Sequence, residues 1–279
     1  MKIIITGSTS FLGRAAAEIF AEKGWEAVLL RHSFEEEAER LPVHADVWLH
    51  FAWAGVGSAG RSDPAIQHFN IAMAQRAAQK ASELGCVRFL FAGSQAEYGH
   101  AQDGSPKREE GPAEPVSEYG RAKLEVCRLL TDFFRQRGTD YIHMRLFSVY
   151  GPGDHETSLV TSLVKGFSEG REMQLGNCSQ AWNYLYIDDA AKAIALLCEK
   201  GGPGIWNVGG TDTRPLREYV EEIRRITGGT GIAAFGTRAD NAEGPADLSP
   251  DISRLEALGF LQQVSFEEGI RRMAGLSSD

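Results

Sequence analysis

The sequence predicts an α/β protein with a doubly wound parallel sheet and a smaller C-terminal lobe. Three observations support this fold class. Short apolar runs, typical of buried parallel strands, alternate with segments of helical periodicity. A glycine-rich turn directly follows the first of these runs. After residue 150 the periodicity loosens into glycine-rich links, which are typical of a smaller lobe.

Strands and helices are expected to alternate through the first half of the chain. Residues 2–6 form a β-branched run, and residues 12–23 carry apolar side chains at helical spacing before Gly24 ends the helix. Buried strands are predicted at residues 25–30, 46–52, 87–92 and 141–146. Two long helices are predicted between the last three strands, at residues 64–84 and 117–135.

The segment between the second and third strands is unusually short. Only fourteen residues separate Arg31 from Asp46, and they include an acidic run at residues 35–37. A further strand and a full crossover helix need more chain than this. We therefore expect the strand in this position to be shortened or lost.

Composition excludes several classes of function. The chain has 279 residues, of which 43% are hydrophobic and 24% charged, as expected for a globular enzyme. A formal charge of -9 without a basic cluster argues against a nucleic-acid partner. No apolar run has the length of a signal peptide or a membrane span, so we expect a cytoplasmic protein without a membrane partner.

Metal binding has little support in the sequence. The four cysteines are scattered without C-x-x-C spacing and are expected to be reduced and mostly buried, and the histidines form no H-x-x-x-H or H-x-H pair. We therefore predict neither a metal site nor disulfides.

A tyrosine and a lysine four residues apart, Tyr119 and Lys123, are the strongest candidates for chemistry. On a helix this spacing places both side chains on one face, where an ammonium group favours the ionised form of a phenol. Such a pair can work as an acid or a base. The alternative is a surface pair on a helix near a proline-rich turn.

Several motifs occur in the order found in one enzyme family. They are the turn from Thr6 to Gly13, Ser94, the Tyr119-x-x-x-Lys123 pair, and the segments 145–152, 184–189 and 206–209. In these motifs the chain resembles, over nearly its whole length, the extended short-chain dehydrogenase/reductases, which include NAD(P)-dependent nucleotide-sugar epimerases, dehydratases and ketoreductases. The resemblance implies a Rossmann domain over residues 1–150, completed by about 182–208, and mainly a substrate-binding lobe over 151–279.

The glycine turn is the predicted site for the cofactor diphosphate. Backbone N–H groups at a helix start attract negative charge. Gly7 permits a tight turn, Gly13 permits close packing of helix on strand, and Ser10 replaces the family's middle glycine, where its hydroxyl can cap the helix or donate to a phosphate. The expected binding residues are Gly7, Ser10, Phe11, Leu12 and Gly13. An ordinary turn without a ligand is the alternative.

Two further positions bear on the cofactor. Arg31 follows the second strand, where an arginine accommodates the 2′-phosphate of NADP and a carboxylate would bind the ribose of NAD, so NADP is favoured over NAD. The segment from His50 to Gly55 resembles the family's loop beneath the nicotinamide ribose, which adds Phe51, Ala52 and Trp53 to the expected site. Trp53 fits a core aromatic equally well.

The resemblance also implies roles in catalysis. Tyr119 is expected to be the acid/base, with its pKa lowered by Lys123 and by the nicotinamide charge. Lys123 would hold the ribose of the cofactor, and Ser94 would hydrogen-bond the reacting oxygen. A turn serine is the alternative interpretation of Ser94.

One relative is excluded by the residues after Ser94. The family's 4,6-dehydratases carry Asp and Glu there, but this chain has Gln95 and Ala96, neither of which can transfer a proton. Glu97 comes one place later, and a structural contact is its simpler interpretation.

Residues on the substrate side are expected to be Ser94, Gln95, Ser148, Trp182 and Asn183. Arginines that the family often uses near a substrate diphosphate are absent here. Arg171, Arg214 or Arg238 could supply the charge, although each also fits an exposed surface arginine.

The sequence thus favours an NAD(P)-dependent enzyme acting on a nucleotide-activated sugar, with 4-keto reduction ahead of 4-epimerisation. Alternatives are the reduction of a non-sugar carbonyl and a non-catalytic regulator that senses a dinucleotide. A homodimer is expected, because the two long helices carry more apolar positions than one buried stripe requires.

Overall fold

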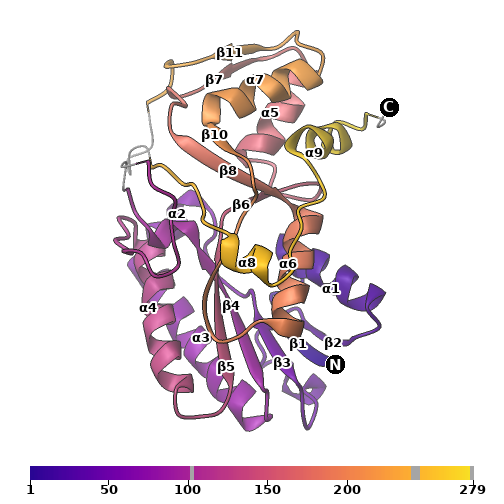
Figure 1. Ribbon diagram of the computed structural model, residues 1–279, viewed down its shortest axis with the longest axis vertical. Helices are drawn as coiled ribbons and strands as arrows, with labels where there is room; N and C mark the ends of the chain where they lie inside the picture. The colour runs from indigo at the N-terminus through magenta and orange to yellow at the C-terminus, as the bar shows by residue number, and fades with distance from the viewer. Residues whose placement is uncertain (101–103, 240–245, 277–279) are drawn as a thin grey trace.

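A six-stranded parallel sheet forms the centre of the computed structural model, which describes residues 1–100, 104–239 and 246–276. Helices cover both faces of this sheet (Figure 1). In spatial order the strands are β2 (Glu26–Leu30), β1 (Lys2–Thr6), β3 (Val47–His50), β4 (Arg88–Ser94), β5 (Asp140–Leu146) and β9 (Gly204–Val208). The predicted fold class is confirmed.

Alternation along β1 divides the core between the two faces. Ile3 and Ile5 pack toward α1 (Phe11–Glu22) and α6 (Ile187–Lys200), because side chains two apart on a strand share a face. Ile4 belongs to the opposite cluster, with buried alanines of one long helix and Val126 of the other. These two helices are α3 (Pro64–Glu83) and α4 (Glu118–Phe134), which lie side by side close to the predicted bounds.

The strand expected to be lost after β2 is indeed absent. Between Leu30 and Val47, a stretch that the structure describes in full, the chain forms one short 3₁₀ helix, η1 (Ala38–Arg40), and no strand. β2 pairs only with β1 and is an edge of the sheet.

The smaller lobe lies beyond the carboxyl ends of the strands (Figure 1, top). It holds a three-stranded sheet of β10 (Thr213–Pro215), β8 (Ala181–Tyr186) and β6 (Ser148–Tyr150), and a pair formed by β11 (Ile232–Ala234) and β7 (Glu172–Gln174). Its helices are α5 (Leu159–Ser168), α7 (Leu216–Ile226) and α9 (Phe266–Met273), while α8 (Ser253–Ala257) packs on β9.

One segment differs from the expected completion of the first domain. The sequence placed residues from about 182 onward in that domain, but β8 belongs to the three-stranded sheet of the smaller lobe. The chain returns to the large sheet with α6, which packs on α1, and with β9. The division into two domains otherwise stays a prediction.

Two further properties concern the chain as a whole. Cys86, Cys127, Cys178 and Cys198 are all buried free thiols. In the part of the chain that the structure describes, no helix is long and apolar enough to cross a membrane.

Candidate active site

The glycine turn after β1 meets the end of β3 at very short range. Gly7 has a φ of +72°, and a Cβ atom there would lie 2.6 Å from the backbone nitrogen of Ala52 and 2.8 Å from the carbonyl carbon of Phe51. Any side chain would therefore clash with backbone. Gly7 allows the two predicted cofactor loops to touch.

Ser10 acts as the N-cap of α1. Its Oγ accepts a hydrogen bond from the N–H of Gly13 (3.1 Å), which realises one of the two roles that the sequence allowed for this serine. Phe11 and Leu12 form the start of the same helix, where backbone N–H groups lack intrahelical partners. The structure thus brings together all five residues predicted at this turn.

A carboxylate that no sequence motif indicates, that of Glu37, folds back onto the residues that follow β2. The Arg31 side chain is exposed, whereas the carboxylate of Glu37 accepts hydrogen bonds from the backbone N–H groups of Arg31 and His32 (2.6 Å each) and also pairs with Arg40. The bond from His32 is the main cause that lowers the pKa of Glu37. The acidic run at residues 35–37 was the only sequence signal, and it gave no indication that the chain folds back.

Ser94, Tyr119 and Lys123 converge near the carboxyl end of β4. Ser94 ends that strand, and its side chain lies close enough to Tyr119, in the first turn of α4, to act to lower the pKa of the phenol. One turn further on, the Lys123 ammonium lies 5.5 Å from the centroid of the Tyr119 ring. Ser117 caps this helix by accepting a bond from the N–H of Gly120 (3.1 Å), which fixes where α4 begins.

The surroundings of Tyr119 act on its phenol in opposite directions. Burial raises the pKa of Tyr119, and the main opposing effect comes from the positive charge of Arg61. The Lys123 ammonium instead donates to the carbonyl oxygen of Ala92 (2.7 Å). Burial also lowers the pKa of Lys123 well below its usual range.

The sequence allowed Trp53 to be either a residue of the cofactor loop or a core aromatic, and its contacts fit both roles. Its indole packs against the core edge-on to Phe91 (5.9 Å between centroids) and also faces Tyr119 edge-on (6.0 Å). The Lys123 ammonium lies 3.5 Å from the centroid of the indole ring. Trp53 is therefore a core aromatic that also forms one wall of the predicted active site.

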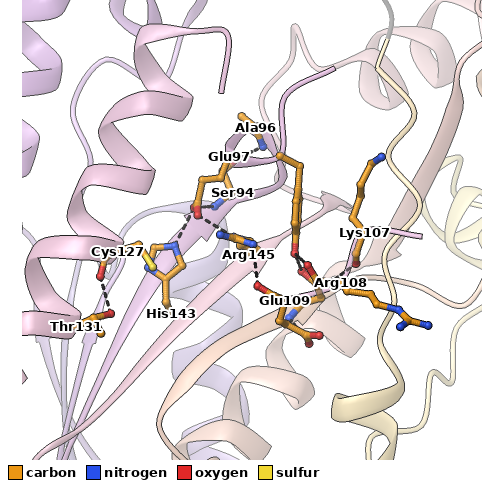
Figure 2. Close-up of polar contacts among 12 residues, drawn as sticks. Ser94, Ala96, Glu97, Lys107, Arg108, Glu109, Cys127, Thr131, His143 and Arg145 are labelled. Atoms are coloured by element: carbon orange, nitrogen blue, oxygen red, sulfur yellow. Dashed lines mark hydrogen bonds and ion pairs between the residues drawn. The ribbon is translucent and has the colours of Figure 1, made fainter. Parts of the chain in front are cut away.

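A buried network of charged side chains holds the backbone N–H of Ser94 in place (Figure 2). Glu97 closes a capping box in η2 (Gln95–Glu97), where its carboxylate accepts from the N–H of Ser94 (2.8 Å). The same carboxylate bonds His143 (2.8 Å) and Arg145 (2.9 Å) of β5. Burial is the largest single effect and acts to lower the pKa of His143, but the charges of Glu97 and Cys127 and the hydrogen bonds to both together raise this pKa to about 9. The structure thus supports the simpler interpretation of Glu97, a structural contact.

The residues predicted on the substrate side separate into two groups. Gln95 donates through Nε2 to Oγ of Ser148 (3.1 Å), so these two lie together beside Ser94. Trp182 is partly buried between an apolar cluster of the smaller lobe and a second one formed by Tyr98, Phe147 and Leu248. Asn183 is fully buried, and its amide bonds Gly210 through both oxygen and nitrogen, with further bonds to residues 212 and 213. This amide ties β8 to the turn between β9 and β10. The expected contact of Asn183 with a substrate stays a prediction.

The arginines suggested for a substrate diphosphate have other partners or lie at the surface. Arg214 pairs with Asp212 (3.1 Å) and with Glu222, and Arg171 pairs with a neighbouring glutamate (2.7 Å). Arg238 is exposed. These contacts favour the interpretation as structural or surface arginines.

Comparison with known proteins agrees with the fold. Residues 3–209 match the NAD dependent epimerase/dehydratase family. The UDP-glucose 4-epimerase of Corynebacterium glutamicum is 25% identical over 267 residues, which cover 82% of this chain and 81% of that enzyme. The GDP-L-fucose synthase of Escherichia coli is 24% identical over 304 residues, which cover 96% of this chain and 94% of that enzyme.

Solved structures show the same fold over nearly the whole chain. The UDP-glucose 4-epimerase of Thermotoga maritima, solved with UDP-glucose, superposes with a TM-score of 0.90 at 22% identity and covers 99% of this chain and 98% of its own. RMD from Pseudomonas aeruginosa, complexed with NADPH, gives 0.88 at 19% identity and covers 98% and 97%. The chain belongs to the NAD dependent epimerase/dehydratase family, and the protein is an NAD(P)-dependent enzyme.

Proposed function

We propose that the enzyme moves hydride between NAD(P) and C4 of a hexose carried on a nucleotide, as a 4-keto reductase or, second, as a 4-epimerase. The observation that carries this proposal is the convergence of Ser94, Tyr119 and Lys123 next to the loop after β3, which itself touches the glycine turn. Two of the relatives described above are named as a UDP-glucose 4-epimerase and a GDP-L-fucose synthase, so nucleotide-linked sugars are the substrate class to test.

The residues at the end of the sheet fit a dinucleotide. A Cβ at Gly7 would fill the narrow space between the two loops, and the first turn of α1 presents backbone N–H groups beside it. When bound, the cofactor supplies or accepts the hydride. The proposed binding residues are Gly7, Ser10, Phe11, Leu12, Gly13, Arg31, Phe51, Ala52, Trp53, Tyr119 and Lys123.

Tyr119 is the proposed acid/base at the C4 oxygen. In reduction its phenol would donate a proton to that oxygen, and in oxidation its phenolate would accept one. The Ser94 hydroxyl, held by the bond of its backbone N–H to Glu97, would orient the same oxygen. Gln95 and Ser148, joined by a hydrogen bond, are the neighbouring groups proposed to contact the sugar.

For the cofactor we propose NADPH ahead of NADH. The exposed guanidinium of Arg31 follows β2 and is suited to a 2′-phosphate. Glu37 acts against this preference, because its carboxylate occupies the adjacent N–H groups and repels an added phosphate. The preference therefore depends on Arg31 outweighing Glu37.

An assay with two substrates tests the proposal. The purified enzyme is given NADPH with a nucleotide-linked 4-keto-6-deoxyhexose and, separately, UDP-glucose with NAD⁺. Loss of NADPH absorbance with formation of the 4-hydroxy sugar supports reduction, and formation of UDP-galactose supports epimerisation. Turnover of simple ketones but of no nucleotide sugar would refute the proposal in favour of a non-sugar carbonyl reductase.

We further propose a homodimer formed through α3 and α4. Phe69 on α3 is 53% exposed, although it is a large aromatic. A groove of about 440 Å³ also runs along the outer faces of both helices, between His68 and Ile71 on α3 and Glu125 on α4. The cytoplasmic location stays a prediction from composition.

A further inference from the structure

The loop after β3 places a positive charge directly on the predicted catalytic tyrosine. This loop ends in the short helix α2 (Ser58–Arg61), which Figure 1 shows near the start of α4. The Arg61 guanidinium carbon lies 4.3 Å from the centroid of the Tyr119 ring. A guanidinium at this distance over an aromatic face makes a cation–π contact.

Two buried amides on α3 hold this loop in place. Asn70 accepts from the N–H of Ala54 (2.8 Å) and donates to the carbonyl of the same residue (3.0 Å). One helical turn earlier, Gln67 donates to the carbonyl of Gly60 (2.8 Å), next to Arg61. Both side chains are almost completely buried. The loop is therefore fastened at its start and just before its arginine.

The loop also closes on itself too tightly for side chains. Gly55 has a φ of +68°, and a Cβ at Gly60 would lie only 2.4 Å from the Cα of Gly55. Two glycines in backbone contact, together with the two amides of α3, fix the point from which Arg61 extends. A flexible surface loop requires neither two glycines in close contact nor buried amides that hold its backbone.

Among the residues that the structure describes, Arg61 brings its positive charge closer to the Tyr119 ring than Lys123 does. Ser94 at the end of β4 acts to lower the pKa of Tyr119, Trp53 faces the ring edge-on from the loop after β3, and Lys123 lies one turn along α4. Glu97 of η2 contributes a negative charge that opposes ionisation of the phenol. The ammonium of Lys123 is turned to the carbonyl of Ala92.

The geometry points to Arg61 as a positioning residue of the active site: its guanidinium fixes the plane of the Tyr119 ring and stabilises the phenolate. This inference rests on the proposed role of Tyr119 as acid/base. It adds Arg61 to Lys123 as a second positive charge near Tyr119, and Lys123 keeps its proposed contact with the cofactor ribose.

Titration of the tyrosine itself tests this inference without any substrate. Tyr119 is replaced by 3,5-difluorotyrosine, whose lower phenol pKa brings ionisation into the range where the protein stays folded, and the single label is followed by fluorine NMR. The titration is repeated with Arg61→Met, with Arg61→Lys and with Arg121→Met. Arg121 is a matched control, because it is an exposed arginine two residues from Tyr119 that pairs with Glu118 (2.5 Å).

We expect Arg61→Met to raise the pKa of the labelled tyrosine by about one unit or more, because a positive charge is lost at close range. Arg61→Lys should shift it less, and Arg121→Met should leave it nearly unchanged. An unchanged pKa in Arg61→Met, or an equal shift in Arg121→Met, would overturn the inference. These results do not depend on turnover, so they remain informative even if no nucleotide sugar proves to be a substrate.

Discussion

Tyr119 is the side chain on which the proposed chemistry depends most directly. Tyr119→Phe removes the transferable proton but changes the volume very little. We expect turnover to fall by about 10²-fold or more, with cofactor affinity nearly unchanged, because the phenyl ring still packs against Trp53 and Arg61. Steady-state kinetics on the true substrate and a fluorescence titration of NADPH measure the two quantities. Full activity in the variant would show that another group moves the proton.

Arg31 is the residue expected to select the cofactor. Arg31→Ala should weaken NADPH binding by roughly tenfold or more, since a charge-assisted contact with phosphate contributes about 1.5–3 kcal/mol, and should leave NADH nearly unaffected. Calorimetric titration of both cofactors provides the measurement, with the exposed Arg121→Ala as the control. Equal weakening of NADPH and NADH would mean that Arg31 does not contact the 2′-phosphate.

At the scale of elements, the ionic contact between η2 and β5 should make stability depend on pH. The pKa of His143 is raised from 6.5 to about 9 in the folded protein. Its contribution is therefore fully present below about pH 6.5 and is lost as the pH rises through 9. This loss amounts to up to about 3 kcal/mol. The pKa of Glu97 is lowered, so its own contribution is lost only toward acid pH.

Denaturant unfolding between pH 6.5 and 9 measures this dependence. The free energy of unfolding of the wild-type protein should fall across the range, and His143→Asn should remove most of that fall, at the expense of a lower stability at pH 6.5. The same pH dependence in both proteins would assign it to groups other than His143.

Strands, helices and the order of motifs could be predicted because each depends on local pattern. The loss of a strand after β2 followed from chain length alone. Side-chain partners distant in sequence could not be predicted in this way. The residues near Asn183 do not indicate that its amide bonds to residues about thirty positions later. Likewise, the residues near Arg61 do not indicate that its guanidinium contacts Tyr119.

The same limit explains two details of the active site that the sequence did not indicate. The spacing of Tyr119 and Lys123 correctly placed both side chains on one helical face, but it could not show that the carbonyl of Ala92 and the indole of Trp53 take up the ammonium. The carboxylate at the end of β2 was missed because Glu37 lies six residues beyond Arg31, and the turn that brings it back has no motif.

At the scale of the whole molecule, light scattering at micromolar concentration should give a mass of twice the 30.5 kDa of the chain. Phe69→Asp should shift the protein toward a monomer, because it places a charge on the proposed contact face of α3. Val43→Asp is the matched control, since Val43 is 97% exposed and lies outside α3 and α4. A wild-type mass of 30.5 kDa would refute the dimer.

The missing strand beside β2 also bears on how long the enzyme keeps its cofactor. If the adenine of the cofactor binds at this edge, no strand beyond β2 would enclose it, so we expect short residence times and ready exchange with the cellular pool. A reductase must discharge its oxidised dinucleotide after every turnover, whereas an epimerase regenerates the same molecule and profits from retaining it. An edge strand at β2 therefore favours a reductase over an epimerase. Gel filtration followed by an absorbance spectrum tests this, and a dinucleotide that stays with the protein would favour the epimerase.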